Sequence, residues 1–331
     1  MKKLLALILA VCMLACGACA FAEEEPSYDF KLGYSVLGAA TNFFVNVNEG
    51  IQQACADHGV ELTWTIDDRD ASKMKTAIDT FVLQGADIIV DFTVLAETGS
   101  AIAAELAKDG IPMLSVDCVY DGCYFFGVDN DGCGRALGEY AKEWVDANWG
   151  GEIDAVQCLY NESSGETVLK RVGSGANYLI AEGYVTEDQV TYTNINSSGS
   201  TVTDVSYVRS LVVDYLTAHP DDDNIVIMAQ TDEQSTAANA AVTSADRLDD
   251  VIIVTNNCDM AVISMLQKGE GCIVGDLNYN SAAYGEQIVQ ACAKILDAKA
   301  KGEEIGWNFY NPVYMVTRDN VWEYYPDPVE G

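Results

Sequence analysis

Short runs of β-branched and apolar residues alternate with longer segments of helical periodicity along almost the whole chain. The first half contains FKLGYSV, VELTWTI, ADIIVDF, IPMLSVD and CYFFGV, and the second half contains EIDAVQCLY, QVTYTN, NIVIMAQ, VIIVTNN and GCIVGDLN. Strands that alternate with helices of about 10 to 15 residues indicate βαβ units and parallel sheets. The segment after the first run agrees, because Phe44, Val47, Ile51 and Ala54 recur at helical spacing. The predicted fold class is therefore α/β.

These runs, with a further one in NPVYMVT at 311–317, are too many for one compact α/β lobe, so we expect two Rossmann-like lobes. The glycine-bearing segment VDNDGCG at 128–134 is typical of a first crossing between two sheets. Because no Ser/Pro-rich linker separates the halves, we expect a hinge made of several short strands. The predicted lobes are 29–130 with 278–308, and 131–277 with 309–325.

The first 22 residues have the pattern of an export signal. Two lysines precede an apolar run, and small residues lead to an A-x-A end at Ala22. Cleavage after Ala22 is favoured over lipidation of Cys16 or Cys19, because Leu14 and Gly17 fit poorly ahead of a lipid-accepting cysteine. A retained membrane anchor also stays open. We expect an exported protein in the periplasm or on the outer face of the cytoplasmic membrane, either free or lipid-anchored.

The charge balance is strongly acidic. The chain has 51 Asp and Glu against 18 Lys and Arg, a net charge of −33. Such a surface repels nucleic acid and anionic headgroups, so nucleic acid is not expected as a partner. An acidic excess of this kind usually promotes solubility.

The cysteines behind the signal favour buried free thiols over disulfides. An even number allows bridges outside the cytosol, but a chain of this length does not need them, and most of these cysteines lie in apolar runs. Cys118 and Cys123 are the pair most worth testing. There is no CxxC, and only His58 and His219 could join a metal cluster, so no metal site is expected.

Motifs of nucleotide binding and acyl transfer are absent. There is no G-x-G-x-x-G after a strand, no P-loop and no G-x-S-x-G. His58 and His219 lie at the ends of predicted helices, where histidine usually interacts with free carbonyls. Ser163 and Glu166 fit a helix capping box, and DDRD at 67–70 fits a strand end followed by an N-cap. We therefore predict no catalytic residues and no cofactor.

Polar residues follow many of the predicted strands. In open parallel sheets ligands bind outside the carboxyl ends of the strands, so we expect these residues to face one cleft. They are Asp67-Asp68, Asp91, Asp117, Asn161, Thr231-Asp232, Asn256-Asn257 and Asn278.

Taken together, the order of motifs resembles the ribose- and galactose-type sugar-binding proteins of bacterial ABC transporters, which have the type 1 periplasmic binding protein fold of LacI-type repressors. The resemblance spans nearly all of 29–325. It includes GADIIVDF, IPMLSVD, FFGVDNDGCGRALGEYAKEW, LTAHPDDDNIVIMAQTDE and VIIVTNNCD. A repressor would begin with a DNA-reading headpiece, whereas this chain begins with an export signal and is acidic.

The resemblance implies a ligand site that begins with Asn42, Phe43 and Phe44, where the family has N-P-F-F. Aromatic faces pack on the C–H faces of sugars, while carboxylates and amides bind the hydroxyls. Phe43 is the better candidate, because helical spacing also places Phe44 with Val47 and Ile51 in the core.

Further ligand residues are implied by the same resemblance. Asp117 matches the family's strand-end aspartate, but Cys118 stands where ribose binders commonly have arginine, so the general role is implied rather than ribose. Lys170 and Arg171 lie near the family's ligand-binding arginine, and Arg171 is favoured. The remaining positions, for which helix capping is the alternative, are Thr231, Asp232, Asn257 and either Asn278 or Asp276; Asp91 and the hinge candidate Asp129 are weaker.

The implied function is capture of a sugar or polyol between two lobes that close about a hinge, and its delivery by a monomer to an ABC permease. A sensory protein that docks on a chemoreceptor or sensor kinase is one alternative. The other is an exported glycosidase, for which Asp117 with Asp232 or Asp276 would supply the two carboxylates.

Overall fold

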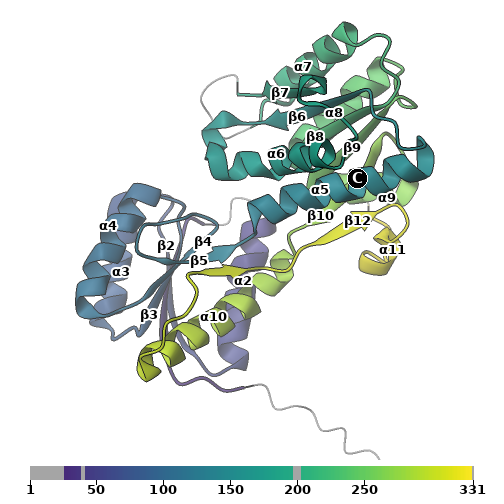
Figure 1. Ribbon diagram of the computed structural model, residues 1–331. Helices are drawn as coiled ribbons and strands as arrows, with labels where there is room; N and C mark the ends of the chain where they lie inside the picture. Colours follow the sequence, from purple (N-terminus) through teal and green to yellow (C-terminus); the bar gives the residue numbers. More distant parts are fainter. Residues whose placement is uncertain (1–25, 39–41, 197–202, 330–331) are drawn as a thin grey trace, which may run out of the picture. The chain divides into compact units, whose positions relative to one another are not determined.

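The computed structural model describes residues 26–38, 42–196 and 203–329 (Figure 1). The expected export signal and its cysteines lie outside the described residues. Strands and helices alternate as the sequence predicted, and the α/β fold class is confirmed. One short strand, β11 (Asn308–Tyr310), was not predicted.

The chain divides into two compact units. The first unit consists of Met1–Ser115, Tyr120–Cys123 and Gly285–Ile305, and the second of Val116–Val119, Tyr124–Tyr284 and Gly306–Gly331. The predicted lobe boundaries at 130 and 277 differ from this division, in which the main crossings of the chain fall near residues 116, 124, 285 and 306.

One six-stranded sheet has the order β11-β5-β4-β3-β1-β2. Strand β1 pairs in parallel with β2 and β3, and β3 pairs in parallel with β4. The other strands of this sheet are β1 (Lys31–Val36), β2 (Glu61–Ile66), β3 (Ile88–Phe92), β4 (Met113–Val116) and β5 (Tyr124–Gly127). The helices of the first unit are α2 (Asn42–Asp57), α3 (Ala71–Leu83), α4 (Ala96–Leu106), η1 (Ala107–Asp109) and, from Gly285 on, α10 (Ser281–Lys301).

Strand β1 shows how the sheet receives a helix on each face. Tyr34 donates a hydrogen bond of 2.5 Å to Asn48 of α2, whereas the adjacent Gly33 faces α3. A Cβ at Gly33 would lie 2.7 Å from the Cβ of Phe81, so only glycine allows α3 to approach the strand this closely. Alternation along one strand therefore places α2 and α3 on opposite faces.

The second sheet has the order β12-β10-β9-β8-β6-β7. All its pairs are parallel except β12 with β10, which is antiparallel. Its strands are β6 (Ala155–Tyr160), β7 (Val190–Asn194), β8 (Ile225–Ala229), β9 (Val251–Asn256), β10 (Ile273–Asn278) and β12 (Tyr314–Thr317). Its helices are α5 (Asn130–Asn148), η2 (Glu162–Ser164), α6 (Gly165–Ala181), η3 (Glu187–Gln189), α7 (Val205–Ala218), α8 (Asp232–Ser244), α9 (Met260–Lys268) and α11 (Val321–Tyr324).

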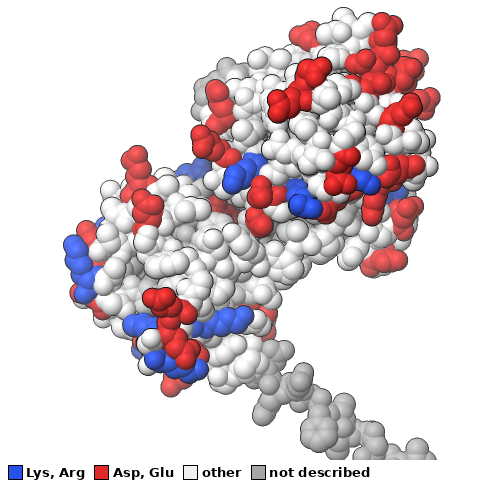
Figure 2. Space-filling model, in the orientation of Figure 1, with Lys and Arg blue, Asp and Glu red and all other residues white. Residues whose placement is uncertain are grey.

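Helices α5 and α6 pack on each other on one face of this second sheet, and α7, α8 and α9 cover the other face. The core below α7 and α8 is built from alternate residues of the strands, among them Ile225 and Ile227 of β8 and Val251 and Ile253 of β9. Because these β-branched side chains share one face, the strand ends are held in fixed register. Acidic side chains are scattered over the visible surface of this unit and are more frequent there than Lys and Arg (Figure 2).

N-cap residues explain where two of the helices begin. Asp70 caps α3 as predicted, since its carboxylate accepts hydrogen bonds from the backbone of Ser72 and Lys73 at 2.8 and 3.0 Å. The predicted capping box of Ser163 and Glu166 is wrong. The side chain of Asn161 accepts from the Ser163 backbone and begins a short 3₁₀ turn, so α6 starts at Gly165.

Gly59, Gly85 and Gly110, which follow α2, α3 and η1, have φ values of 72°, 83° and 70°. This left-handed conformation ends a helix with little strain only when the residue lacks a Cβ. Within the described ranges, no helix has the length and apolar character needed to cross a bilayer.

Candidate functional site

In the first unit, three phenylalanine rings gather where β3 ends and α2 begins. The ring centroid of Phe44 lies 4.9 Å from that of Phe92, and the Phe43 ring lies 5.8 Å from Phe44 and 6.3 Å from Phe92. Phe43 and Phe44 are half-buried, whereas Phe92 is buried. Asn42 begins α2, and its side chain lies outside the described part. The cluster thus leaves aromatic surface accessible at a sheet edge.

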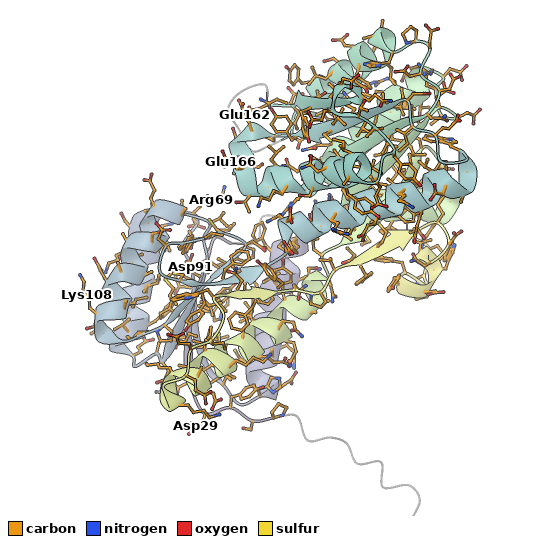
Figure 3. The ribbon with its side chains drawn as sticks, in the orientation of Figure 1. Asp29, Arg69, Asp91, Lys108, Glu162 and Glu166 are labelled. Atoms are coloured by element: carbon orange, nitrogen blue, oxygen red, sulfur yellow. The ribbon has the colours of Figure 1, made fainter. Side chains whose placement is uncertain are left out.

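Asp91 at the end of β3 belongs to a buried polar network of the first unit (Figure 3). Its Oδ2 accepts hydrogen bonds from the Tyr120 hydroxyl at 2.6 Å and the Thr93 backbone at 3.1 Å, and its Oδ1 accepts from the Thr93 hydroxyl at 2.7 Å. Thr93 also contacts Asp67, which accepts from Ser35 at 2.7 Å. Burial raises the pKa of Asp91 to about 6, although the Tyr120 and Thr93 donors oppose that shift. Both oxygens of Asp91 are thus engaged inside the unit.

In the second unit, Asp117 follows β4 directly and adopts the left-handed region with φ 54°. Its Oδ1 accepts a hydrogen bond of 3.1 Å from Tyr284. Burial raises the pKa of Asp117 to about 6, and Arg171, Tyr284 and the backbone of Val128 lower it. The Asp117 carboxylate is an acceptor for hydroxyl groups, and the Arg171 guanidinium is near enough to lower its pKa, although the two form no ion pair within 4 Å among the described residues.

Arg171 of α6 is held in a defined orientation. Its Nε donates a 2.6 Å hydrogen bond to Asn130, and its guanidinium lies over the Tyr279 ring, 4.9 Å from the centroid. Among the described residues, its terminal guanidinium nitrogens have no hydrogen-bond partner. Arg171 therefore presents donors that an oxygen-rich ligand can use.

Close packing of α5 on α6 brings Arg171 to Asn130. A Cβ at Gly134 of α5 would lie only 2.1 Å from the carbonyl oxygen of Lys170, and one at Gly138 would lie 2.6 Å from that of Gly175. These glycines allow the two backbones to touch. Lys170 itself is exposed, which separates it from its neighbour Arg171.

The ends of β8 and β9 carry three of the predicted residues. Thr231 precedes α8 as its N-cap residue, but its hydroxyl makes no capping bond and is buried without a partner in the described residues. Asp232 is 1% exposed and accepts hydrogen bonds from the Thr255 hydroxyl at 2.9 Å and the Asp259 backbone at 2.6 Å. Asn257 is half-buried, with φ 119°. Asp232 thus joins the starts of α8 and α9.

Asn278 at the end of β10 uses its amide within the unit. Its Nδ2 donates to the Tyr325 hydroxyl at 2.7 Å, and its Oδ1 accepts from the Asn280 backbone at 2.5 Å. Asp276, the alternative to Asn278 in the sequence, is fully buried two residues earlier on β10.

Sequence reasoning did not find the residues that orient the charged pair. Asn130, Tyr279 and Tyr284 position Arg171 and Asp117, yet Tyr279 and Tyr284 lie more than 100 residues from their partners in sequence. Their place directly after a predicted strand end, in NYNSAAYGE, was the available signal. Several buried polar atoms near these strand ends lack a partner in the described residues: Gln230 Nε2, Asn256 Oδ1, the Tyr279 hydroxyl and Asn311 Oδ1.

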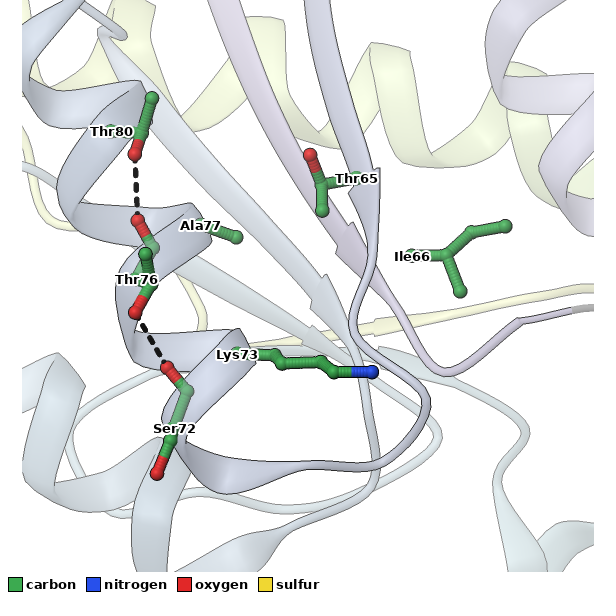
Figure 4. A pocket seen from close by; sticks show the side chains of 7 residues that line it. All are labelled: Thr65, Ile66, Ser72, Lys73, Thr76, Ala77 and Thr80. Carbon is green, nitrogen blue, oxygen red and sulfur yellow. Dashed lines mark hydrogen bonds between the residues drawn. The ribbon is translucent and has the colours of Figure 1, made fainter.

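A surface pocket of about 400 Å³ in the first unit contains none of the predicted site residues (Figure 4). The hydroxyls of Thr76 and Thr80 donate to helix carbonyls at 2.8 Å, and Lys73 pairs with Asp68. Three of its polar side chains thus already have partners within the unit. The lining residues are Thr65, Ile66, Ser72, Lys73, Thr76, Ala77 and Thr80.

The two histidines bind protein groups, and most cysteines of the described ranges are buried free thiols. His58 lies between the Pro26 carbonyl at 2.6 Å and the Glu286 carboxylate at 2.8 Å, and His219 ends α7 beside Asp222. Cys123 is a buried free thiol, so its bridge to Cys118 is not formed in this structure. In the described ranges, no three His, Cys, Asp or Glu side chains are placed to hold a metal ion.

Comparison with known proteins places this geometry in context. Fructose import binding protein FruE of Bifidobacterium longum is 25% identical over 319 residues, which cover 92% of each chain. The xylitol-binding protein of Mycolicibacterium smegmatis is 24% identical over 315 residues, covering 93% of this chain and 82% of that protein. The solved structure of the periplasmic ribose ABC transporter of Conexibacter woesei matches with a TM-score of 0.73 at 15% identity, covering 92% and 97% of the two chains.

The structural match establishes the shared fold, which the two doubly wound sheets and the antiparallel β12 already indicated. A family model, described as periplasmic binding protein domain, matches residues 32–301, which is most of the chain. The chain therefore belongs to the periplasmic binding protein domain family.

Proposed function

We propose that this protein is the extracytoplasmic solute-binding component of an ABC importer and that its ligand is a sugar or a polyol. The family supports a binding role. The names of the fructose import and xylitol-binding relatives support a polyhydroxylated ligand. Both relatives match the chain along more than 90% of its length, so the likeness is not confined to one unit.

The observation that carries this proposal is that Arg171 and Asp117 are both held in fixed orientations in the second unit, with Arg171 near enough to lower the pKa of Asp117. A sugar hydroxyl both donates and accepts, so it is bound best where a donor and an acceptor lie together. Arg171 offers unengaged terminal N–H groups, and Asp117 offers a carboxylate whose Oδ1 is fixed by Tyr284. Because Asn130 and the Tyr279 ring hold the guanidinium in place, little side-chain entropy is lost on binding.

The aromatic cluster provides the apolar counterpart. A sugar ring has C–H faces that pack on flat aromatic surface, and Phe43 and Phe44 leave such surface accessible. We include Thr231 and Asn257 in the proposed site, because the Thr231 hydroxyl has no partner and Asn257 is partly exposed. Asp91, Asp232 and Asn278 would support the site indirectly, since their side-chain atoms already bind protein groups.

In the proposed mechanism, the ligand stabilises the conformation in which all of its contacts form. A permease could then recognise the loaded form. Small-angle X-ray scattering with and without ligand measures this change, and a smaller radius of gyration with ligand is expected.

The test is a thermal-shift screen of the chain from residue 23 against pentoses, hexoses, deoxysugars, polyols, nucleosides and amino acids, followed by calorimetry. A sugar or polyol should raise the melting temperature of the native protein, and Phe43→Ala or Asp117→Ala should abolish the shift. Leu83→Ala is the matched control, because Leu83 is 88% exposed on α3 and should leave the shift unchanged. Binding only by nucleosides or amino acids would overturn the sugar assignment.

The same preparation tests the enzymatic alternative. Incubation with a panel of aryl glycosides should release no aryl alcohol. Release that is lost in Asp117→Ala would identify a glycosidase in place of a binding protein.

A further inference from the structure

Two buried carboxyl groups meet in the second unit, where β10 passes the start of α8. Asp276 lies within β10 and is 0% exposed. In the sheet register it stands beside Thr255 of β9, whose hydroxyl donates to Asp232 at 2.9 Å. Thr255 thus brings the two carboxyl groups together, since it binds Asp232 through its hydroxyl and stands beside Asp276 in the sheet. The charge of Asp276 accordingly raises the pKa of Asp232.

The hydrogen bonds of this pair are unequally divided. Asp232 accepts from the Thr255 hydroxyl and from the Asp259 backbone. Neither side-chain oxygen of Asp276 has a hydrogen-bond partner within 3.5 Å among the described residues, although the backbone and the thiol of Cys258 are near enough to lower its pKa. The Cys258 thiol lies alongside but donates to the backbone carbonyl of Asp276 at 3.5 Å. A buried carboxylate left in this state would be strongly unfavourable.

No positive charge balances the pair. Among the described residues, no Lys, Arg or His forms a salt bridge with Asp232 or Asp276. The other titratable groups that face the pair are acidic or neutral: Asp259 at the start of α9, Cys258, Tyr279 and Tyr325. In the described ranges no cluster suitable for a metal ion exists.

We propose that Asp232 and Asp276 share one proton, and that this proton joins the start of α8 to β10 and makes the second unit sensitive to alkaline pH. Two carboxylates cannot hydrogen-bond each other, whereas a carboxyl and a carboxylate can. One proton therefore satisfies Asp276 and removes one of two buried charges.

The electrostatic surroundings agree with this arrangement. Burial raises the pKa of both carboxyls, that of Asp276 to about 7, and the charge of Asp276 raises that of Asp232 further. The folded pair holds its proton at a pH where the unfolded chain, with aspartates near 3.8, has released it. The pair's contribution to stability is thus complete in acid and is lost as pH rises from about 4 through about 7.

The pair also regulates the proposed ligand site, a part of the inference that rests on the proposed function. Asp232 immediately follows Thr231, and Asp276 lies three residues before Tyr279, whose ring supports Arg171. Loss of the proton would push the two carboxylates apart and disturb both flanks. Ligand should therefore bind more weakly as pH rises.

The first experiment needs no ligand. Melting temperatures of the native protein and of Asp276→Asn are measured from pH 5 to pH 9. An amide at 276 donates to Asp232 without a proton, so the variant should melt higher than the native protein at pH 8.5, and the difference between the two should grow with pH. A difference that does not depend on pH would overturn the proposal.

Asp91→Asn is the matched control. Asp91 is an equally buried carboxyl, but its oxygens accept hydrogen bonds from Tyr120 and Thr93, and an amide nitrogen would face those donors. This variant should be destabilised throughout and should show no gain at high pH. If both variants gain stability at pH 8.5, relief of general negative charge explains the effect and the shared proton is refuted.

A cation in place of the proton is tested by adding Ca²⁺ or EDTA at pH 8.5. No change in melting temperature is expected. Stabilisation by Ca²⁺ that is absent in Asp276→Asn would show that a metal ion, and not a proton, joins the two carboxyl groups.

With a ligand from the screen, the dissociation constant of the native protein should rise up to about tenfold per pH unit above pH 7, while that of Asp276→Asn stays constant. Failure to find any ligand leaves the melting experiment decisive, so the proposals on proton and ligand are judged separately.

Discussion

Replacement of Arg171 by lysine keeps the positive charge but removes the planar fork that the site orients. The native guanidinium donates through Nε to Asn130 at 2.6 Å and lies 4.9 Å from the centre of the Tyr279 ring, which leaves its terminal nitrogens for the ligand. A lysine ammonium cannot hold Asn130 and bind two ligand oxygens in the same plane. We expect ligand affinity to fall about 10- to 100-fold, which corresponds to about 1.4–2.8 kcal/mol.

The magnitude follows from the bonds that are lost. A hydrogen bond to a charged group contributes about 1.5–3 kcal/mol. Stacking of a cation on an aromatic ring adds about 0.5–1 kcal/mol at an exposed site and more when it is desolvated. Lysine recovers part of both, so the net loss should correspond to about one charged hydrogen bond.

Isothermal titration calorimetry with the ligand from the screen measures this loss, and the adjacent residue supplies the control. Lys170 is exposed, and its carbonyl packs on Gly134 through the backbone alone, so Lys170→Gln should bind as the native protein does. If Lys170→Gln loses affinity and Arg171→Lys keeps it, the site has been assigned to the wrong residue.

Two further substitutions and one chemical modification test the packing within each unit. Gly134→Ala should lower the free energy of unfolding in urea by about 1–3 kcal/mol and weaken ligand binding as well, because its methyl group would force α6 and Arg171 away from α5; unchanged stability would contradict the close packing. Tyr120→Phe should cost about 1–3 kcal/mol, since Asp91 loses a buried donor. Burial raises the pKa of Cys55 and of most other thiols, so Ellman's reagent at pH 8 should modify the folded chain slowly and all eight mature cysteines after unfolding; fewer than eight would reveal a disulfide.

The elements of the fold could be read from the sequence because their signals are local. An apolar β-branched run such as NIVIMAQ can be buried on both faces only as a central strand, and β8 (Ile225–Ala229) is that strand. Strand β11 (Asn308–Tyr310) was not predicted because three residues are too few to show the alternation that distinguishes a strand from a loop. The prediction of a capping box at Ser163 was wrong because two residues that can cap a helix, Asn161 and Ser163, lie within three residues of each other, and Asn161 is the one that accepts a backbone hydrogen bond.

The candidate site was predictable in its residue types and not in its connections. A polar residue after a buried strand could be recognised one strand at a time, and this pointed to Asp117, whereas Arg171 was implied by the family resemblance. It could not distinguish Asn278, whose amide binds Tyr325 and Asn280, from Asp276, whose carboxyl faces Asp232. The two side chains lie on the same face of β10, so that difference depends on which groups pack beside each position in the folded chain.

The sequence by itself determined the class of the fold, the strand order along the chain and the acidic, polar character of the strand ends, because hydrophobic period, turn residues and charge act over a few neighbouring residues. Only the tertiary structure decided the partners of the functional side chains. Arg171 meets Asn130 and Tyr279, and Asp232 meets Asp276, across 41, 108 and 44 residues of sequence. Such contacts form when the helices and strands pack, and burial then sets the pKa of each carboxyl.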